Sequence, residues 1–184
     1  VAVGEGAVLT KGTSISASWT KITVPFTSEP TAVAYGTTGN AKYVVGTVAG
    51  EIYRSADGAT WTLAASGLGR ISSISYYAGK FYATLMYDSG ILASSDGTTW
   101  EVIANIQEFY NGVSSICDAY GVLYAVGYLT GNYAYSIDYG KTWAVFPCSA
   151  ITNAAFVFPS TNSAFLVGNG MDDNIPFIYA GKST

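Results

Sequence analysis

Ser94-Ser-Asp-Gly-Thr-Thr-Trp100 is the stretch that decides the fold, because the chain repeats it. Two more clear copies are Ser55-Ala-Asp-Gly-Ala-Thr-Trp61 and Ser136-Ile-Asp-Tyr-Gly-Lys-Thr-Trp143, and a decayed copy, Ser14-Ile-Ser-Ala-Ser-Trp19, lacks the Asp and the Gly. The four tryptophans stand at positions 19, 61, 100 and 143, in steps of 42, 39 and 43 residues. A fixed period near 40 residues indicates a repeat architecture.

Each repeat also contains short apolar runs that predict strands. Around the middle copy of the phrase, the runs are Ile71–Tyr76, Tyr82–Leu85, Ile91–Ser94 and Trp100–Ile103. The runs are rich in β-branched and aromatic residues and are bounded by Gly, Asp, Asn or Ser, and no 3.6-residue apolar period is long enough to predict a helix. Four antiparallel strands every ~40–45 residues are typical of a propeller blade. We therefore predict an all-β chain, a β-propeller of four-stranded antiparallel blades.

The repeat boundaries predict one propeller domain over residues 1–184, with about four to five blades in this chain. Complete blades are expected at 31–64, 71–104 and 113–146, and partial blades at 1–24 and 151–184. The first partial blade lacks its first strand and the last lacks its fourth, so the two overlap and do not merge into one blade. Because an open edge strand invites aggregation, we expect the ring to be completed by flanking sequence, another copy or a partner. A five-bladed ring with two thinned blades is the alternative.

The repeated phrase resembles the Asp-box, or bacterial neuraminidase repeat, of sialidases, sortilin-type receptors, xyloglucanases and photosystem II assembly factors. Residues Ser136 to Trp143 match the Ser-x-Asp-x-Gly-x-Thr-Trp pattern in full. The copies at 55–61 and 94–100 lack one residue between Asp and Gly, a contraction that resembles repeats in bacteriophage tail and bacterial surface proteins. The resemblance implies a β-propeller with the Asp-boxes on the face opposite the active site, and it implies no single activity, because fold and function are separable.

We predict that the Asp-box residues are structural. The Asp carboxylate can accept backbone N–H bonds across a tight turn between the third and fourth strands, Gly takes a positive φ, and Ser or Thr adds local hydrogen bonds. The tryptophan then packs between blades and buries a large area. The predicted structural residues are Ser55, Asp57, Gly58, Trp61, Ser94, Asp96, Gly97, Trp100, Ser136, Asp138, Gly140 and Trp143.

Composition narrows the partners and the location. The chain is 49% hydrophobic and only 11% charged, with 15 Tyr, no His, a net charge of −4 and a pI of about 4.5. An acidic chain is not expected to bind nucleic acid, and no apolar run reaches the ~20 residues that span a bilayer. We expect a virion or extracellular surface protein, without membrane insertion.

No cofactor or metal is predicted. Cys117 falls in a first strand and Cys148 just after a fourth strand, so unpaired thiols are favoured over a disulfide. The Asp172-Asp173-Asn174 stretch offers oxygen ligands that could suit calcium, but such a stretch is more often a solvated turn.

An enzymatic role is not expected of this chain. In sialidases three arginines clamp the substrate carboxylate, and this chain has two, Arg54 and Arg70. The carboxylates outside the Asp-boxes show no spacing that glycoside hydrolysis demands, and no nucleophilic or metal-hydrolytic arrangement is recognisable.

A binding role is favoured, on the face away from the Asp-boxes. There the loops between second and third strands meet the loops that join blades, and together they supply aromatic, amide and carboxylate side chains. Sugar rings stack on aromatic faces while their hydroxyls pair with amides and carboxylates. The predicted ligand-binding residues are Tyr87, Asp88, Phe109, Tyr110, Asn111, Tyr128, Asn132 and Asp172. The alternative reading of these tyrosines is ordinary loop and inter-blade packing.

Three functions remain open at this point. The favoured one is a non-enzymatic propeller module of a bacteriophage tail, fibre or cell surface that attaches to host glycan or to another virion protein. The second is a fragment of an Asp-box sialidase-like glycoside hydrolase whose catalytic residues lie outside this chain. The third is a purely scaffolding propeller, which predicts a flat protein-binding face.

Overall fold

The computed structural model describes residues 1–4, 8–11, 18–37, 39, 41–119, 121–147, 151–160, 163–170 and 176–182, with side chains everywhere except 8–11 and 151–182. Within these residues the ordered elements are β-strands and one short 3-10 helix, η1 (Gln107–Phe109). The prediction of an all-β chain is confirmed.

Three sheets have four strands each, and in each sheet neighbouring strands follow chain order. The first contains β4 (Pro30–Tyr35), β5 (Tyr43–Thr47), β6 (Ile52–Ser55) and β7 (Thr62–Ala65). The second contains β8 (Ile71–Tyr77), β9 (Lys80–Leu85), β10 (Gly90–Ser94) and β11 (Glu101–Asn105). The third contains β12 (Val113–Ala119), β13 (Val122–Gly127), β14 (Asn132–Ser136) and β15 (Ala144–Pro147). The predicted four-stranded antiparallel blades are therefore confirmed.

Two further antiparallel sheets have three strands each. The N-terminal sheet contains β1 (Ala2–Gly4), β2 (Val8–Lys11) and β3 (Thr20–Ile22). The C-terminal sheet contains β16 (Ile151–Ser160), β17 (Ser163–Gly170) and β18 (Pro176–Lys182). Counted against the repeat, and within the described residues, the N-terminal sheet has no counterpart of β4 and the C-terminal sheet has none of β7.

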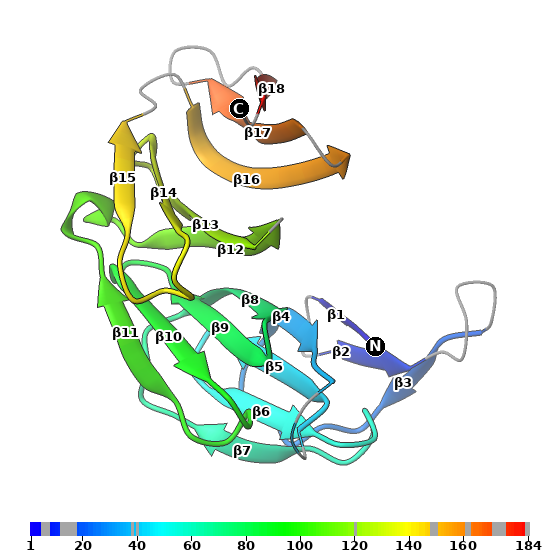
Figure 1. Ribbon diagram of the computed structural model, residues 1–184. Helices are drawn as coiled ribbons and strands as arrows, with labels where there is room; N and C mark the ends of the chain where they lie inside the picture. Colours follow the sequence, from blue (N-terminus) through cyan, green and yellow to red (C-terminus); the bar gives the residue numbers. More distant parts are fainter. Residues whose placement is uncertain are drawn as a thin grey trace. The chain divides into compact units, whose positions relative to one another are not determined.

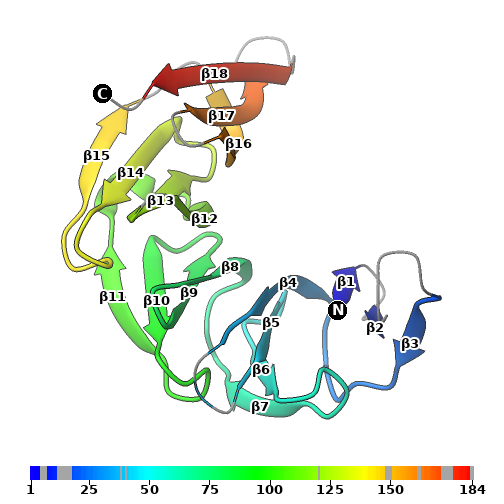
Figure 2. The same cartoon turned by 45° about the vertical axis from the view of Figure 1, so that its right-hand side comes forward.

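The residues fall into two compact units by their internal contacts. Unit 1 comprises Val1–Ala83 and Leu92–Glu101, and unit 2 comprises Thr84–Ile91 and Val102–Thr184, so the sheet β8–β11 contributes residues to both. Within unit 1, β4 and β8 lie side by side, and within unit 2, β12 and β16 do (Figure 1, Figure 2). Adjacent first strands of this kind are typical of consecutive propeller blades around a common axis.

The central strands are buried on both faces. Val44 and Val45 of β5, and Phe81 and Tyr82 of β9, are all fully buried, although successive residues of a strand point to opposite faces. Burial on both faces explains why these runs are continuously apolar instead of alternating. Because each fully buried large apolar side chain contributes roughly 1.5–3 kcal/mol, the central strands supply much of the hydrophobic stabilisation.

A glycine allows the close approach of the first and second blades. A Cβ atom on Gly46, in β5, would lie 2.3 Å from Cγ2 of the buried Ile71, so only glycine fits against this side chain. The Thr31 hydroxyl donates to the Ile71 carbonyl at 2.7 Å and to the Gly46 carbonyl at 3.2 Å. These contacts tie β4 to both neighbouring strands.

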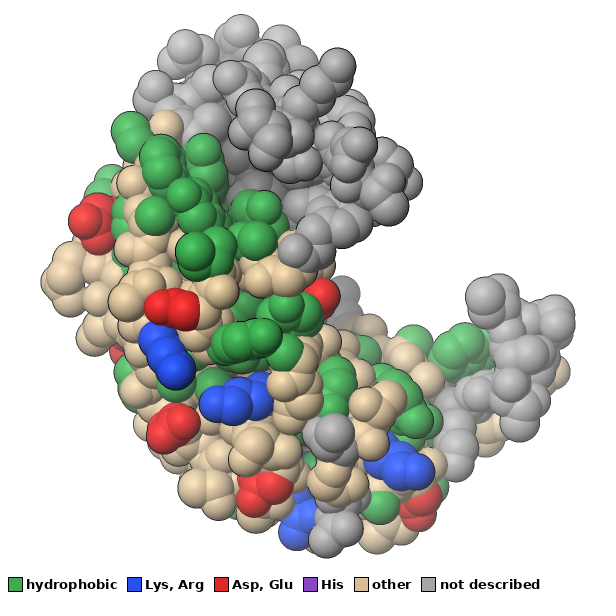
Figure 3. All heavy atoms as spheres, viewed as in Figure 1, with side chains coloured by type: hydrophobic (Ala, Val, Ile, Leu, Met, Phe, Trp, Pro, Cys, Tyr) green, Lys and Arg blue, Asp and Glu red, His purple; other side chains and the backbone are tan. Residues whose placement is uncertain are grey.

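Aromatic side chains stack on one face of the third sheet. The Phe146 ring centroid lies 5.5 Å from that of Tyr133 and 5.6 Å from that of Tyr135, with interplanar angles of 19° and 9°. The two tyrosines are two residues apart on β14 and therefore share a face. Figure 3 shows hydrophobic side chains gathered over β14 and β15. Offset aromatic pairs contribute ~0.5–1.5 kcal/mol each beyond the area that they bury.

Candidate functional site

Three Ser-Asp-Gly turns join the third strand of each four-stranded sheet to the fourth. They are Ser55–Trp61, Ser94–Trp100 and Ser136–Trp143. In the first turn, Asp57 Oδ1 accepts the N–H groups of Ala59 and Thr60, both at 2.8 Å. The Ser55 hydroxyl donates to Asp57 Oδ1 at 3.0 Å and accepts the Gly58 N–H at 2.8 Å. Two short side chains thus hold the whole turn.

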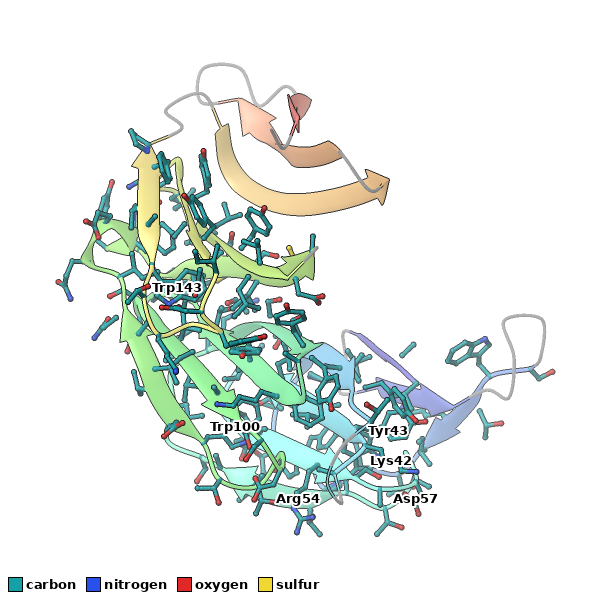
Figure 4. All side chains as sticks on the ribbon, in the orientation of Figure 1. Lys42, Tyr43, Arg54, Asp57, Trp100 and Trp143 are labelled. Carbon is teal, nitrogen blue, oxygen red and sulfur yellow. The ribbon has the colours of Figure 1, made fainter. Side chains whose placement is uncertain are left out.

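The other two turns repeat this arrangement. Asp96 Oδ1 accepts the N–H groups of Thr98 at 2.7 Å and Thr99 at 2.9 Å. Asp138 Oδ1 accepts the Thr142 N–H at 2.9 Å, and its Oδ2 accepts the Thr142 hydroxyl at 2.6 Å. Figure 4 labels one residue of each turn, Asp57, Trp100 and Trp143, close to where the third and fourth strands of its sheet are joined. The turns use these polar atoms for their own folding.

The hydrogen bonds to the three carboxylates stabilise their charged form. Backbone N–H donors from Thr60 and Ala59 hold the pKa of Asp57 well below its usual range. Backbone N–H donors likewise lower the pKa of Asp96, and bonds from the Thr142 hydroxyl and N–H lower that of Asp138 to about 2. These carboxylates are therefore ionised at neutral pH.

The full-length turn differs from the contracted ones by one residue. In the contracted turn Gly58 alone has a positive φ, 72°, whereas in the full turn Tyr139 and Gly140 have φ values of 63° and 86°. The clamp is nevertheless the same, because the hydroxyls of Ser55 and Ser136 accept the N–H groups of Gly58 and Gly140, both at 2.8 Å. The extra residue is accommodated inside the turn.

The tryptophans of the turns are buried to different depths. Trp61 is only 6% exposed, and its ring meets that of Phe26 edge-on at 5.7 Å. Trp100 and Trp143 are half-buried, and the Trp143 Nε1–H donates to the Gly140 carbonyl of its own turn at 3.1 Å. The expectation that the tryptophan packs between sheets is met most fully by Trp61, whose cluster includes side chains of the N-terminal sheet.

At the opposite end of the third sheet, residues 106–112 form a linker that enters β12 from β11. Its anchors are Ile106 and Phe109, which are 5% and 0% exposed. The Phe109 ring is accommodated by Gly127, where a Cβ atom would lie 2.8 Å from Phe109 Cδ1. The prediction of Phe109 as a ligand-contacting residue is therefore wrong, because its ring lies in the core beneath the linker.

Two loops are attached to the linker through its backbone. The Tyr87 N–H, from the β9–β10 loop, donates to the Asn111 carbonyl at 3.0 Å, and the Tyr128 N–H, from the β13–β14 loop, donates to the Gly112 carbonyl at 2.7 Å. A Cβ atom on Gly112, which has a φ of 101°, would lie 2.3 Å from the Tyr87 nitrogen. Glycine at this position is what allows the three segments to come together.

Both loops present a large side chain from a left-handed backbone. Tyr87 has a φ of 66° and Leu129 a φ of 56°, and the two occupy the same position of the repeat, two residues after Leu85 and Gly127. A left-handed conformation is uncommon for such residues and costs ~1–3 kcal/mol. Strained residues of this kind cluster at functional sites, so the shared feature directs attention to this end of the sheet.

Several exposed side chains lie on the three segments that these backbone hydrogen bonds join. Tyr87 is 67% exposed, Tyr110 71% and Leu129 43%. The half-buried Tyr128 meets Tyr87 with ring centroids 5.7 Å apart and an interplanar angle of 88°. We call Tyr87, Tyr110, Tyr128 and Leu129 the tyrosine surface. Sequence reasoning missed Leu129, although the repeat alignment places it at the position of Tyr87.

The polar residues predicted beside these aromatic side chains take part in the loop structure. Asp88 is exposed, and its Oδ1 accepts the Gly90 N–H at 3.0 Å. Asn132 donates its Nδ2–H to the Glu108 carbonyl at 3.0 Å and so ties the β13–β14 loop to the linker. Asn111 is half-buried and contributes its carbonyl, as described above. These hydrogen bonds help to position the loops that carry the tyrosine surface.

A small cavity lies beside the second Ser-Asp-Gly turn, in unit 1. Its volume is about 180 Å³, and it is lined by Lys80, Ala93, Ser94, Ser95, Thr99 and Glu101. The Ser94 hydroxyl there already donates to Asp96 Oδ1 and accepts the Gly97 N–H. The charged side chains that line this cavity, Lys80 and Glu101, are both exposed.

The remaining predicted groups are placed as follows. Arg54 is half-buried on β6, and Arg70 is exposed just before β8. Cys117 is a free thiol, and burial together with the Asp118 carboxylate raises its pKa to about 12. Cys148 and Asp172 to Asn174 lie outside the described residues. Within the part of the chain that is described, no helix is long and apolar enough to cross a membrane, and no group of three His, Cys, Asp or Glu side chains is arranged to hold a metal ion.

No protein-family model matches the chain, and no curated protein matches it. Solved structures do. YCF48 bound to D1 peptide superposes with a TM-score of 0.63 at 21% identity, over 90% of this chain and 56% of that one. Virginiamycin B lyase from Staphylococcus aureus gives a TM-score of 0.68 at 14% identity, over 93% and 62%. The computationally designed Ika4 protein gives 0.56 at 13% identity, over 86% and 95%.

These similarities bear on the fold alone, because the identities are low and proteins that share a fold differ in function. The chain spans little more than half the length of the YCF48 chain. The three four-stranded sheets and the superpositions agree with each other. The chain therefore has the β-propeller fold.

Proposed function

We propose that this chain is a non-catalytic binding module of a virion or cell surface, and that it holds a glycan on the tyrosine surface. The observation that carries the proposal is the Tyr87 ring, exposed to solvent from a left-handed backbone that is bonded to the linker. Strained residues cluster at functional sites, and Tyr87 combines the strained backbone with a ring that contacts a second tyrosine, Tyr128.

The arrangement suits a sugar ligand physically. Tyrosine offers a large flat contact area with only two side-chain torsions to fix, so little entropy is lost on binding. The hydrogen bonds from Tyr87 and Tyr128 to the linker fix the loops before a ligand arrives, and such preorganisation lowers the cost of association. Sugar rings stack on aromatic faces, and the phenol hydroxyls can bond to sugar hydroxyls.

The location on a virion or cell surface rests on the repeat. The contracted phrases at 55–61 and 94–100 resemble repeats of bacteriophage tail and bacterial surface proteins. A low charge fraction with many tyrosines accords with a surface that stacks and hydrogen-bonds. We propose no catalytic role, since the chain has only Arg54 and Arg70 where a sialidase uses three arginines. The alternative, a fragment of a sialidase-like glycoside hydrolase, would need catalytic residues from outside this chain.

The test is binding of the purified chain to an array of bacterial surface polysaccharides. We expect Tyr87→Ala to lower binding at least tenfold, because removing a central aromatic anchor commonly costs more than about 1.4 kcal/mol. The matched control is Tyr139→Ala. Tyr139 is also an exposed tyrosine in a left-handed conformation, in the Ser-Asp-Gly turn of the third sheet. Equal losses in both variants, or no binding by the folded chain, would overturn the proposal.

A second candidate ligand is a peptide segment of another surface or virion protein. One similar structure is YCF48 bound to D1 peptide, so a propeller of this kind can take a peptide. Exposed tyrosines with a neighbouring leucine, Leu129, are also a composition found in protein interfaces. Retention of a virion or surface protein that is lost in Tyr87→Ala, together with a blank glycan array, would favour this candidate.

A further inference from the structure

We infer that the tyrosine surface selects uncharged glycans and excludes those that carry carboxylate, phosphate or sulfate groups. The inference rests on the proposed function and adds the ligand's charge class. It is carried by two independent features of the site, its side-chain charges and the engagement of its backbone N–H groups.

The charged side chains of the two loops and the linker are all acidic. No Lys or Arg occurs between Lys80 and Lys141, a stretch that contains both loops and the linker. Asp88 follows Tyr87 directly, and Glu108 lies two residues before Tyr110, and both acidic side chains are exposed. Screening in physiological salt acts over ~8 Å, so a ligand lying on the tyrosine surface is within the field of these carboxylates. A sugar acid there would meet like charge, and the two loops and the linker themselves contain no Lys or Arg to compensate it.

The backbone of the site offers little to an anion either. Left-handed residues can create concave sets of free N–H groups that bind anions, but five N–H groups of the two loops and the linker already have acceptors within the protein. In the β9–β10 loop, the Tyr87 N–H donates to the Asn111 carbonyl and the Gly90 N–H to Asp88 Oδ1, both at 3.0 Å. In the linker, the Gly112 N–H donates to the Phe109 carbonyl at 2.6 Å. In the β13–β14 loop, the Tyr128 N–H donates to the Gly112 carbonyl at 2.7 Å and the Asn132 N–H to Thr130 Oγ1 at 3.3 Å.

The groups that face outward suit an uncharged sugar. The rings of Tyr87 and Tyr110 provide aromatic surface for the C–H face of a pyranose. Phenol hydroxyls are neutral donors and acceptors, and a carboxylate such as that of Asp88 accepts bonds from sugar hydroxyls. A ligand rich in hydroxyl donors and free of negative charge satisfies all of these groups together.

The first experiment uses an array that contains uncharged bacterial polysaccharides beside ones bearing uronic acid, phosphate or sulfate. We expect binding to uncharged polysaccharides only, and its loss in Tyr87→Ala but not in Tyr139→Ala. Binding of anionic polysaccharides that is lost in Tyr87→Ala would overturn the charge inference while the proposed function stands. If a folded sample binds no polysaccharide on the array, the proposed function is overturned, and the charge inference that rests on it is overturned too.

The second experiment changes the charge without changing the shape. In the double variant Asp88→Asn with Glu108→Gln, the Asn oxygen can still accept the Gly90 N–H. We expect the affinity for anionic polysaccharides, relative to uncharged ones, to rise about two- to fivefold, which corresponds to ~0.4–1 kcal/mol, within the range of exposed charge pairs. The charge-matched control is Glu101→Gln with Asp118→Asn, both exposed and outside the loops and linker. An equal rise in the control, or no rise in the double variant, would contradict the inference.

Discussion

The two ends of the four-stranded sheets satisfy their backbone groups in different ways. At one end, each Ser-Asp-Gly turn bonds its N–H groups to its own Ser and Asp side chains, a few residues away. At the other end, the loops before β10 and β14 bond to a linker that lies elsewhere in the sequence. The hydrogen bonds within the Ser-Asp-Gly turns repeat almost unchanged from sheet to sheet, whereas the bonds at the other end vary. Repetition therefore marks the part of a blade that folds it, and under the proposed function variation marks the part that binds.

Removing the tryptophan of the first Ser-Asp-Gly turn should cause the largest loss of stability. Trp61→Ala truncates a buried aromatic side chain in contact with Phe26, so the free energy of unfolding should fall by ~3–5 kcal/mol. Urea unfolding followed by circular dichroism measures it. Trp100→Ala is the comparison, and its smaller expected loss follows from half-burial. A loss below about 1 kcal/mol for Trp61→Ala would contradict the packing described for this turn.

Gly112→Ala should disturb the opposite end, where the linker contacts the β9–β10 and β13–β14 loops. The added Cβ would overlap the Tyr87 nitrogen, and alanine at positive φ is strained, so we expect a loss of ~2 kcal/mol together with loss of ligand binding. Gly67→Ala is the matched control, because Gly67 has a φ of 73° but nothing within 4 Å of the new atom. Its expected cost is ~1 kcal/mol. Equal stability and equal binding in both variants would show that the close contact is unimportant.

Acid should weaken the three Ser-Asp-Gly turns. The pKa values of Asp57, Asp96 and Asp138 are lowered by folding, so their ionised forms stabilise the native state above the unfolded pKa of ~3.9. This contribution is lost as the pH falls from about 4 towards the folded values, about 2 for Asp138. Melting temperatures between pH 5 and pH 2 test it. Asp138→Ala should lower the melting temperature at pH 5 and flatten this dependence, and a dependence identical to that of the parent chain would count against it. The raised pKa of the Asp118 carboxyl acts in the opposite direction.

Tyr110→Ala should have the smallest effect on stability and still affect binding. The ring is 71% exposed, so the free energy of unfolding should change by less than ~0.5 kcal/mol. Affinity for the bound glycan should fall about tenfold, as for a contact residue near the centre of an interface. Unfolding in urea and glycan binding, measured on the same sample, separate the two effects. Unchanged affinity would remove Tyr110 from the tyrosine surface.

The strands, the turns and the face that carries the loops could be predicted from the sequence, because these features depend on local chemistry. Ser, Asp and Gly within a few residues of each other determine a turn in any context. The fate of Phe109 could not be predicted in the same way, because its burial depends on the space left by Gly127 on a different strand. The role of Asn132 also depends on a distant partner, the Glu108 carbonyl. The left-handed conformation of Tyr87 could not be predicted either, because its side-chain type does not favour it.

The Ser-Asp-Gly turn of the third sheet has a practical consequence for protein engineering. Tyr139 is an additional residue in that turn, yet the Ser136–Gly140 bond has the same 2.8 Å length as its counterpart in the shorter turn. The turn therefore tolerates a change of length at this one position without losing its clamp. A single labelling cysteine inserted after Asp57 or Asp96 is therefore expected to leave the Ser–Gly bond of that turn intact.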